Sequence, residues 1–169
     1  MAPPGVPDDP RTHERAAPEV EVVIEVPRGS FLKRDAAGRV CFVSPLPCPY
    51  NYGAVPSMLG LEGDLLDALV LGPRLALGTR LRVRAWAAIT LSDRGLVDDK
   101  LICSVQPPGA DEIDRVLRFF RFYAGCKGVL NRVRRRRGRN ACEGLISAPA
   151  ALTRAVALPA GWRGAPVPF

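Results

Sequence analysis

Hydrophobic and polar residues alternate in two stretches of the chain, and this alternation predicts β-strands. Val20 to Val26 places Val or Ile at every second position, and Arg80 to Thr90 begins by alternating Arg with apolar residues. Because the side chains of a strand point alternately to its two faces, each stretch has one apolar face. Arg80, Arg82 and Arg84 then share the other face, which is either an exposed sheet face or a contact between subunits.

Shorter apolar segments separated by turn residues predict further strands. Phe31 to Asp35 and Val40 to Val43 flank the sequence Ala-Ala-Gly-Arg, so we expect a hairpin there. Asn51 to Gly53 is predicted to be a tight turn that presents a tyrosine hydroxyl. Asp93 to Lys100 is predicted to be a loop, followed by a strand over Leu101 to Val105.

The segment Asp111 to Tyr123 has the period of an amphipathic helix. Its apolar stripe is formed by Ile113, Val116, Leu117, Phe120 and Tyr123. Acidic residues at its beginning suit the positive end of the helix dipole, and Gly125 is predicted to end it. Ser147 to Val156 is predicted to be a second, short helix with Ser147 as its N-cap.

These elements predict an α+β protein that is mainly β, built as a small closed barrel of about five strands flanked by helices. Residues 1–18 are rich in proline and polar residues, so we expect a disordered arm. The folded domain is then residues 19–158, and residues 159–169 form a loose C-terminal tail.

Composition fits one globular domain and argues against several classes of protein. The 169 residues are 47% hydrophobic and 24% charged, and no apolar run approaches the roughly 20 residues of a membrane helix. The N-terminal segment lacks the apolar centre of a signal peptide, so we expect a cytoplasmic protein with no membrane partner. The five cysteines form no Cys-x-x-Cys pair, and the only histidine, His13, lies in the arm. A zinc site, a disulfide framework and histidine-based catalysis are therefore not expected.

The net charge of +7 suggests an acidic partner. Six arginines lie within the eight residues from Arg132 to Arg139. Such a run either binds RNA or another polyanion or is a solvated segment. Because no recognition motif accompanies the run, we do not expect nucleic acid to be the partner.

Three carboxylates lie within the six residues from Glu62 to Asp67. The apolar run that follows, Ala68 to Leu71, has the length of a buried strand. The acids are thus held at the mouth of a buried strand, where an unpaired negative charge is costly. A hard divalent cation such as Mg²⁺, which takes oxygen ligands, is one partner that would offset it. The other interpretation is a solvated turn that happens to be acidic.

Two pairs of opposite charge lie two residues apart in the chain. Asp98 and Lys100 share a face if the chain is extended, and so do Lys33 and Asp35. An acid and a base side by side can hold a metal ion together with the phosphate that the metal neutralises. Asp98 and Lys100 are equally consistent with a surface ion pair, which would contribute little to stability.

Five segments of the chain, in this order, resemble motifs of the family I soluble inorganic pyrophosphatases. They are Ile24–Ser30, Ser44–Gly53, Glu62–Leu71, Asp93–Lys100 and Phe119–Tyr123. The third is similar to the family signature DGDPLDVLVL, and the fourth repeats that family's spacing of Asp, Asp and Lys. The resemblance covers residues 20–126.

The resemblance implies an OB-like five-stranded barrel with helices, a homo-oligomer, and Mg²⁺-dependent hydrolysis of inorganic pyrophosphate to two phosphates. The metal ligands that it implies are Glu62, Asp67, Asp93, Asp98, Glu25 and Asp35. The catalytic residues that it implies are Asp64, which would orient or deprotonate the attacking water, and the phosphate-contacting Lys33, Lys100, Tyr52 and Tyr123.

The chain also departs from the family pattern, and three of the six departures, Cys48, Ala124 and Val40, remove phosphate-binding groups. The departures are Cys48 for Tyr, Ala124 for Lys, Val40 for Arg, Glu62 for Asp, Asp35 for Glu and Leu65 for Pro. Arg39 would reach the site if a bulge preceded Val40, and Lys127 lies one helical turn beyond Ala124. The departures leave two alternatives to a pyrophosphatase. One is a catalytically weak paralogue that binds phosphate or a partner protein, and the other is an OB-like nucleic-acid binder that uses the arginine run.

Overall fold

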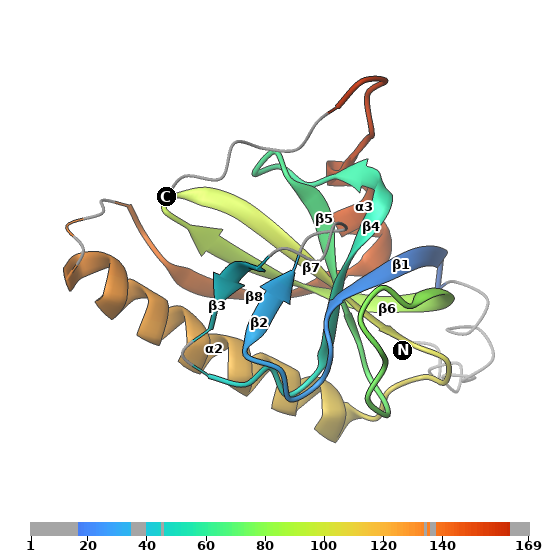
Figure 1. Cartoon of the computed structure of the whole chain (residues 1–169), viewed down its shortest axis with the longest axis horizontal. Coiled ribbons are helices and arrows are strands. Elements are labelled where there is room, and N and C mark those ends of the chain that lie inside the picture. The colour runs from blue at the N-terminus through green and yellow to red at the C-terminus, as the bar shows by residue number, and fades with distance from the viewer. Residues whose placement is uncertain (1–16, 35–39, 45, 134, 136–137, 163–169) are drawn as a thin grey trace, which may run out of the picture.

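The computed structural model of the chain describes residues 17–34, 40–44, 46–133, 135 and 138–162. Within these residues five strands pair in a ring, accompanied by two helices (Figure 1). The ring runs β1, β4, β5, β7, β6, and the pairing of β6 with β1 returns it to its first strand. The predicted mainly-β fold with five barrel strands and flanking helices is confirmed.

The ring strands are β1 (Glu19–Val26), β4 (Asn51–Leu59), β5 (Leu65–Val70), β6 (Arg80–Asp93) and β7 (Leu96–Ser104). Neighbours in the ring are antiparallel, except that β5 and β7 are parallel. The other strands are β2 (Leu32–Arg34) and β3 (Val40–Val43), which pair with each other, β8 (Ala141–Ser147), which pairs with β6, and β9 (Val156–Ala157), which pairs with β4. The helices are α2 (Ala110–Val133), which lies along β8, and α3 (Ala148–Arg154) (Figure 1).

Two apolar clusters hold these elements together. The larger cluster joins residues of all five ring strands to α3, and it includes the alternate residues Val20, Val22 and Ile24 of β1. The smaller cluster joins β5, β6 and β7 to Val116 and Phe120 of α2. The alternation in β1 and the apolar stripe of α2 therefore face the core as predicted.

The arginine face of β6 is exposed and pairs with acids of the neighbouring strand. Arg80 lies 3.0 Å from Glu21, and Arg82 lies 3.6 Å from Glu19. Both pairs are largely solvated, so they contribute little to stability. The arrangement agrees with the first interpretation of this face, an exposed surface of the sheet.

The predicted turn at Asn51–Gly53 is wrong, because these residues begin β4. The Asn51 side chain is fully buried and accepts hydrogen bonds from the backbone N–H groups of Arg28 and Leu75. Its amide nitrogen donates to the carbonyls of Val70 and Pro73. A Cβ on Gly53 would lie 2.1 Å from the Val23 carbonyl oxygen of β1, so the glycine serves a close approach of strands. Asn and Gly are common in turns, but here tertiary contacts override that preference.

The predicted loop at Asp93–Lys100 is also wrong. It is a tight hairpin in which β6 and β7 pair almost to their ends, with Asp93 opposite Leu96. Arg94 (φ 52°) and Gly95 (φ 87°) form the two-residue turn, and two positive φ angles are typical of a type I′ hairpin.

Helix α2 continues past Gly125, where we predicted its end, to Val133. A glycine inside a helix costs about 1 kcal/mol, which the contacts of α2 with β8 offset. The second helix is shorter than predicted, but Ser147 does cap it by accepting a hydrogen bond from Ala150 N. Strand β8 was not predicted.

Several predictions fall outside the described residues. They concern Asp35, Arg39, most of the arm 1–18, the tail from 163 onward and three arginines of the Arg132–Arg139 run. Within the part of the chain that the structure describes, neither α2 nor α3 is long and apolar enough to cross a membrane.

Candidate active site

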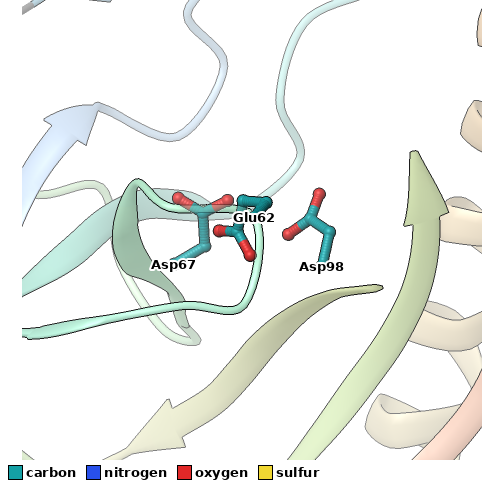
Figure 2. A group of neighbouring side chains, drawn as sticks. All are labelled: Glu62, Asp67 and Asp98. Carbon is teal, nitrogen blue, oxygen red and sulfur yellow. The ribbon is translucent and has the colours of Figure 1, made fainter. Parts of the chain in front are cut away.

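Three of the predicted metal ligands come together on neighbouring elements. Glu62 lies in the turn before β5, Asp67 in β5 and Asp98 in β7. One carboxylate oxygen from each lies within 4.8 Å of the others, and the three side chains point toward one another (Figure 2). The parallel pairing of β5 with β7, which sets Asp67 opposite Lys100, brings the two strands' acids to one place.

Lys100 is the buried cation at the centre of these acids. Its Nζ lies 2.5 Å from Asp67 Oδ2 and 2.9 Å from Asp98 Oδ1, and only 6% of its side chain is exposed. Burial alone would lower the pKa of Lys100, but Asp67 and Asp98 outweigh burial and raise it well above its usual range. Lys100 is therefore charged at neutral pH, and the interpretation of Asp98 and Lys100 as a surface ion pair is wrong.

Tyr52 and Lys33 extend the same network. The Tyr52 hydroxyl donates to Asp67 Oδ2, and Lys100 Nζ donates to that hydroxyl at 3.0 Å. Burial and the charge of Asp67 raise the pKa of Tyr52 well above its usual range, so the phenol stays neutral. Lys33 Nζ lies 5.5 Å from the centre of the Tyr52 ring and 3.2 Å from Glu25 Oε2.

The carboxylates carry more negative charge than the nearby lysines satisfy. Burial, and then the charge of Asp98, raise the pKa of Glu62 from 4.5 to about 8. Glu62 Oε2 is buried without a hydrogen-bond partner among the described residues. An unpaired carboxylate oxygen beside two further acids is a donor set that suits a hard divalent cation. The residues therefore fit a metal ion, and of the three acids from Glu62 to Asp67 only Asp64 is exposed as a solvated turn would have it.

The other predicted site residues lie outside this cluster. Asp93, at the end of β6, pairs with Lys127 at 2.6 Å and is not within the 4.8 Å group of Glu62, Asp67 and Asp98. Asp64 is exposed, and its Oδ1 accepts a hydrogen bond from Leu65 N at 2.8 Å. Tyr123 stacks against Phe119 on α2, with the ring centres 6.1 Å apart.

The departures from the family pattern can be placed as well. Burial raises the pKa of the Cys48 thiol, which keeps the thiol neutral where the family has a tyrosine. Ala124 is 6% exposed in α2, so it faces the protein rather than solvent. Leu65 is the first residue of β5 and is half-buried. These positions supply no charge of their own for a phosphate.

Gly60 is a residue that sequence reasoning missed. A Cβ at this position would lie 2.6 Å from both carboxylate oxygens of Glu62, because the long side chain of Glu62 lies over the Gly60 backbone. The available signal was the glutamate that replaces the family's aspartate two residues later. The absence of a side chain at Gly60 thus makes room for the extra methylene of Glu62.

We therefore expect Gly60→Ala to displace the Glu62 carboxylate and so to weaken binding of a divalent metal ion about fivefold, as measured by titration calorimetry. The fold should survive, because the clash falls on the flexible end of a side chain. In a Glu62→Asp background the same change should reduce metal affinity less, because the shorter aspartate side chain avoids the new methyl group. Gly109→Ala is the matched control, since a Cβ there meets nothing within 4 Å. An equal loss in both backgrounds would contradict this role of Gly60.

A five-stranded ring with three converging carboxylates and a buried lysine defines the class of an OB-like domain whose acidic cluster could hold a metal ion. The comparisons with known proteins narrow that class. The sequence model of the inorganic pyrophosphatase family matches residues 22–150. The chain belongs to this family, and the resemblance seen in its motifs is confirmed.

Individual relatives carry the family name, and this chain matches part of the length of each. The inorganic pyrophosphatase of Gluconobacter oxydans is 34% identical over 93 residues, which are 50% of this chain and 54% of that protein. Soluble inorganic pyrophosphatase 2 of Chlamydomonas reinhardtii is 41% identical over 91 residues, 49% of this chain and 47% of that protein. The chain thus spans about half the length of these curated relatives.

Solved structures agree over more of the chain. The inorganic pyrophosphatase of Thermus thermophilus superposes with a TM-score of 0.62 at 25% identity, covering 91% of this chain and 92% of that one. An inorganic pyrophosphatase of Coxiella burnetii gives a TM-score of 0.63 at 24% identity, covering 80% and 90%. The second likeness is one of fold alone.

Proposed function

We propose that this protein hydrolyses inorganic pyrophosphate to two phosphates with the help of Mg²⁺. The observation that carries the proposal is the convergence of Glu62, Asp67 and Asp98 within 4.8 Å beside a buried lysine. Family membership implies a divalent metal, and an all-oxygen donor set favours Mg²⁺ as that metal.

The residues of the site have distinct proposed roles. Glu62, Asp67 and Asp98 would hold the metal, with Glu25, Asp93 and Asp35 as proposed ligands of further ions. A bound divalent cation supplies positive charge against the pyrophosphate tetra-anion and makes water a stronger nucleophile. Asp64, exposed directly before β5, is the proposed acceptor of the proton that the attacking water loses.

The phosphate would be held by cations and phenols already fixed in place. Lys100 is charged and held between Asp67 and Asp98, and Lys33 stays charged because Asp67 and Glu25 outweigh its burial and raise its pKa. Such pre-set charges stabilise developing negative charge without reorganising during the reaction. The neutral Tyr52 would donate a hydrogen bond, and Tyr123 is proposed to contribute a second hydroxyl from α2.

The test is phosphate release from pyrophosphate in the presence of Mg²⁺. The wild type should release phosphate, a chelator should abolish release, and Asp64→Asn should lower kcat about hundredfold, the lower end of the range for a lost general base. Asp111→Asn, the same change at an exposed position in the first turn of α2, is the control and should match the wild type. Undiminished turnover in Asp64→Asn would remove Asp64 from the mechanism.

A second candidate function is a weak paralogue that binds phosphate or a partner protein without useful turnover. The neutral residues Cys48 and Ala124 at phosphate-binding positions favour it. It would be supported if the wild type bound Mg²⁺ by calorimetry but released no phosphate. A homo-oligomeric, cytoplasmic protein stays a prediction under either function.

A further inference from the structure

We propose that Lys127 is a built-in counter-cation for Asp93 and competes there with a divalent metal ion. The inference rests on the proposed function in one respect, namely that Asp93 is a ligand of an additional metal. It concerns a residue of this chain that lies beyond the family's helix motif, Phe119–Tyr123, and that supplies a charge one turn after Ala124.

The geometry of the pair is direct. Lys127 Nζ lies 2.6 Å from Asp93 Oδ2, and the side chains are 34% and 25% exposed. The other oxygen, Asp93 Oδ1, is buried and has no hydrogen-bond partner among the described residues. Arg94 Nε is 3.9 Å from Oδ1, which is too long for a hydrogen bond. Among the residues that the structure describes, Lys127 is thus the side chain that hydrogen-bonds this carboxylate, and Arg94 adds only a longer ion pair.

The continuation of α2 is what brings Lys127 to Asp93. The two residues are 34 positions apart and meet only because the helix runs through Gly125 and Gly128 to Val133. A helix that ended at Gly125 would leave Lys127 in a connecting loop. The additional turns therefore place an ammonium group at the end of β6.

The charge of Lys127 also reaches the main acidic cluster. Burial raises the pKa of Asp98, and Lys127 is among the cations that oppose this rise. Lys127 therefore acts between Asp93, which it contacts, and Asp98, whose charge it partly offsets. A divalent cation approaching either acid meets a positive charge that is already present, and like charges at short range repel.

Competition follows from this arrangement. A metal ion that takes Asp93 as a ligand must break the Lys127 hydrogen bond, and a charge-assisted bond of this length is stronger than a neutral one. Since Lys127 is about one third exposed, solvent screens the pair and the ammonium can swing into water. The result is a reversible competitor that lowers metal affinity without abolishing metal binding.

The same lysine has one other reasonable role, which is to replace the phosphate-binding lysine that is missing at Ala124. In that case its target would be the substrate, and its contact with Asp93 would be incidental. The two roles predict opposite responses to its removal. Loss of a competitor tightens metal binding, whereas loss of a phosphate ligand leaves metal binding unchanged and weakens anion binding.

The experiment is Mg²⁺ titration calorimetry of the full chain, for the wild type and Lys127→Met. We expect Lys127→Met to bind Mg²⁺ about fivefold more tightly, a factor set by the modest strength of a partly solvated ion pair. In an Asp93→Asn background the gain should fall below about twofold, because only the longer-range effect of Lys127 on Asp98 remains. Arg118→Met, which removes an exposed charge from the same helix, is the control for a general field effect and should change affinity by less than about twofold.

Each outcome decides the inference. Equal affinities in wild type and Lys127→Met would overturn it, and so would equal gains from Lys127→Met in the wild-type and Asp93→Asn backgrounds. Weaker binding of inorganic phosphate with unchanged Mg²⁺ affinity would also overturn it. Lys127→Gln provides a second variant if the methionine variant does not fold.

Pyrophosphate turnover is measured separately, so that the two proposals can fail independently. An active wild type with no change in Mg²⁺ affinity on replacing Lys127 refutes only the role of Lys127. An inactive wild type with the expected gain in affinity refutes only the proposed function.

Discussion

Replacing Lys100 with methionine should lower the free energy of unfolding by about 3–5 kcal/mol at pH 7 without metal, the range measured when one partner of a buried ion pair is removed. Lys100 is 5% exposed and is the shared partner of Asp67 and Asp98. Its removal leaves two buried carboxylates beside Glu62 with no cation in contact among the described residues. The loss is measured by urea unfolding followed by circular dichroism.

The pH dependence of this loss has a definite sign. The pKa of Lys100 is raised above its unfolded value, so its contribution to stability is fully present below about pH 10 and is lost only as pH rises through the folded pKa. The defect of Lys100→Met should therefore be complete at pH 7. It should shrink in acid, where Asp67 and Asp98 take up protons and no longer need a counter-charge.

Two comparisons make this prediction decisive. Lys127→Met removes the same charge from a side chain that is 34% exposed, so it should cost no more than about 1 kcal/mol. Adding Asp67→Asn to Lys100→Met should recover part of the stability, because one of the two stranded charges is gone. A loss below about 1 kcal/mol in Lys100→Met, the scale of a solvated ion pair, would show that water enters the site and screens its charges.

The parts of the fold that the sequence predicted are those where one strand or helix has a strong apolar face. Apolar residues repeat at the period of a strand from Val20 to Ile24 of β1 and at the period of a helix from Val116 to Phe120 of α2. These apolar residues are buried. Such a pattern is local, so it can be recognised without knowing what the face packs against. Helix α3 was found for the same kind of reason, since Ser147 and Pro149 form a local start signal.

The errors occur where the decisive contacts come from far along the chain. Asn51 and Gly53 are turn residues by composition, yet they sit in β4 because Arg28, Val70 and the backbone of β1 surround them. Strand β8 alternates only weakly between half-buried and exposed residues and contains Gly144, so it has no strong pattern of its own. Its pairing with β6 defines it.

The candidate site shows the same division. The acids at Glu62 and Asp67 were recognisable because three carboxylates precede an apolar run. Whether Lys100 is buried or exposed could not be read from its neighbours, since its burial depends on the parallel pairing of β5 with β7. The contact between Asp93 and Lys127 joins residues 34 apart, and neither residue type nor spacing signals it.

Glu62 should make the metal-free protein less stable as pH rises, and Glu62→Gln should remove that dependence. The folded pKa of Glu62 is about 8 against 4.5 for the usual carboxyl, because burial and then Asp98 disfavour its charge. Between these two values the folded protein binds more protons than the unfolded chain, so the free energy of unfolding falls as pH increases. Stability that is fully present below pH 4.5 is lost as pH rises through about 8.

The measurement is urea unfolding of wild type and Glu62→Gln at several values from about pH 4.5 to about pH 9 in a chelating buffer. The two proteins should be equally stable in acid. At the alkaline end the glutamine variant should be more stable by about 2–3 kcal/mol, which is the free energy of the Glu62 pKa shift reduced because this side chain is partly exposed. Saturating Mg²⁺ should reverse the order of stability of the two proteins at high pH. The cation offsets the destabilising negative charge of Glu62 in the wild type and has less charge to offset in the variant. Parallel pH curves for the two proteins would mean that Glu62 does not titrate in this range. Parallel responses to Mg²⁺ would mean that its carboxylate is not part of the metal site.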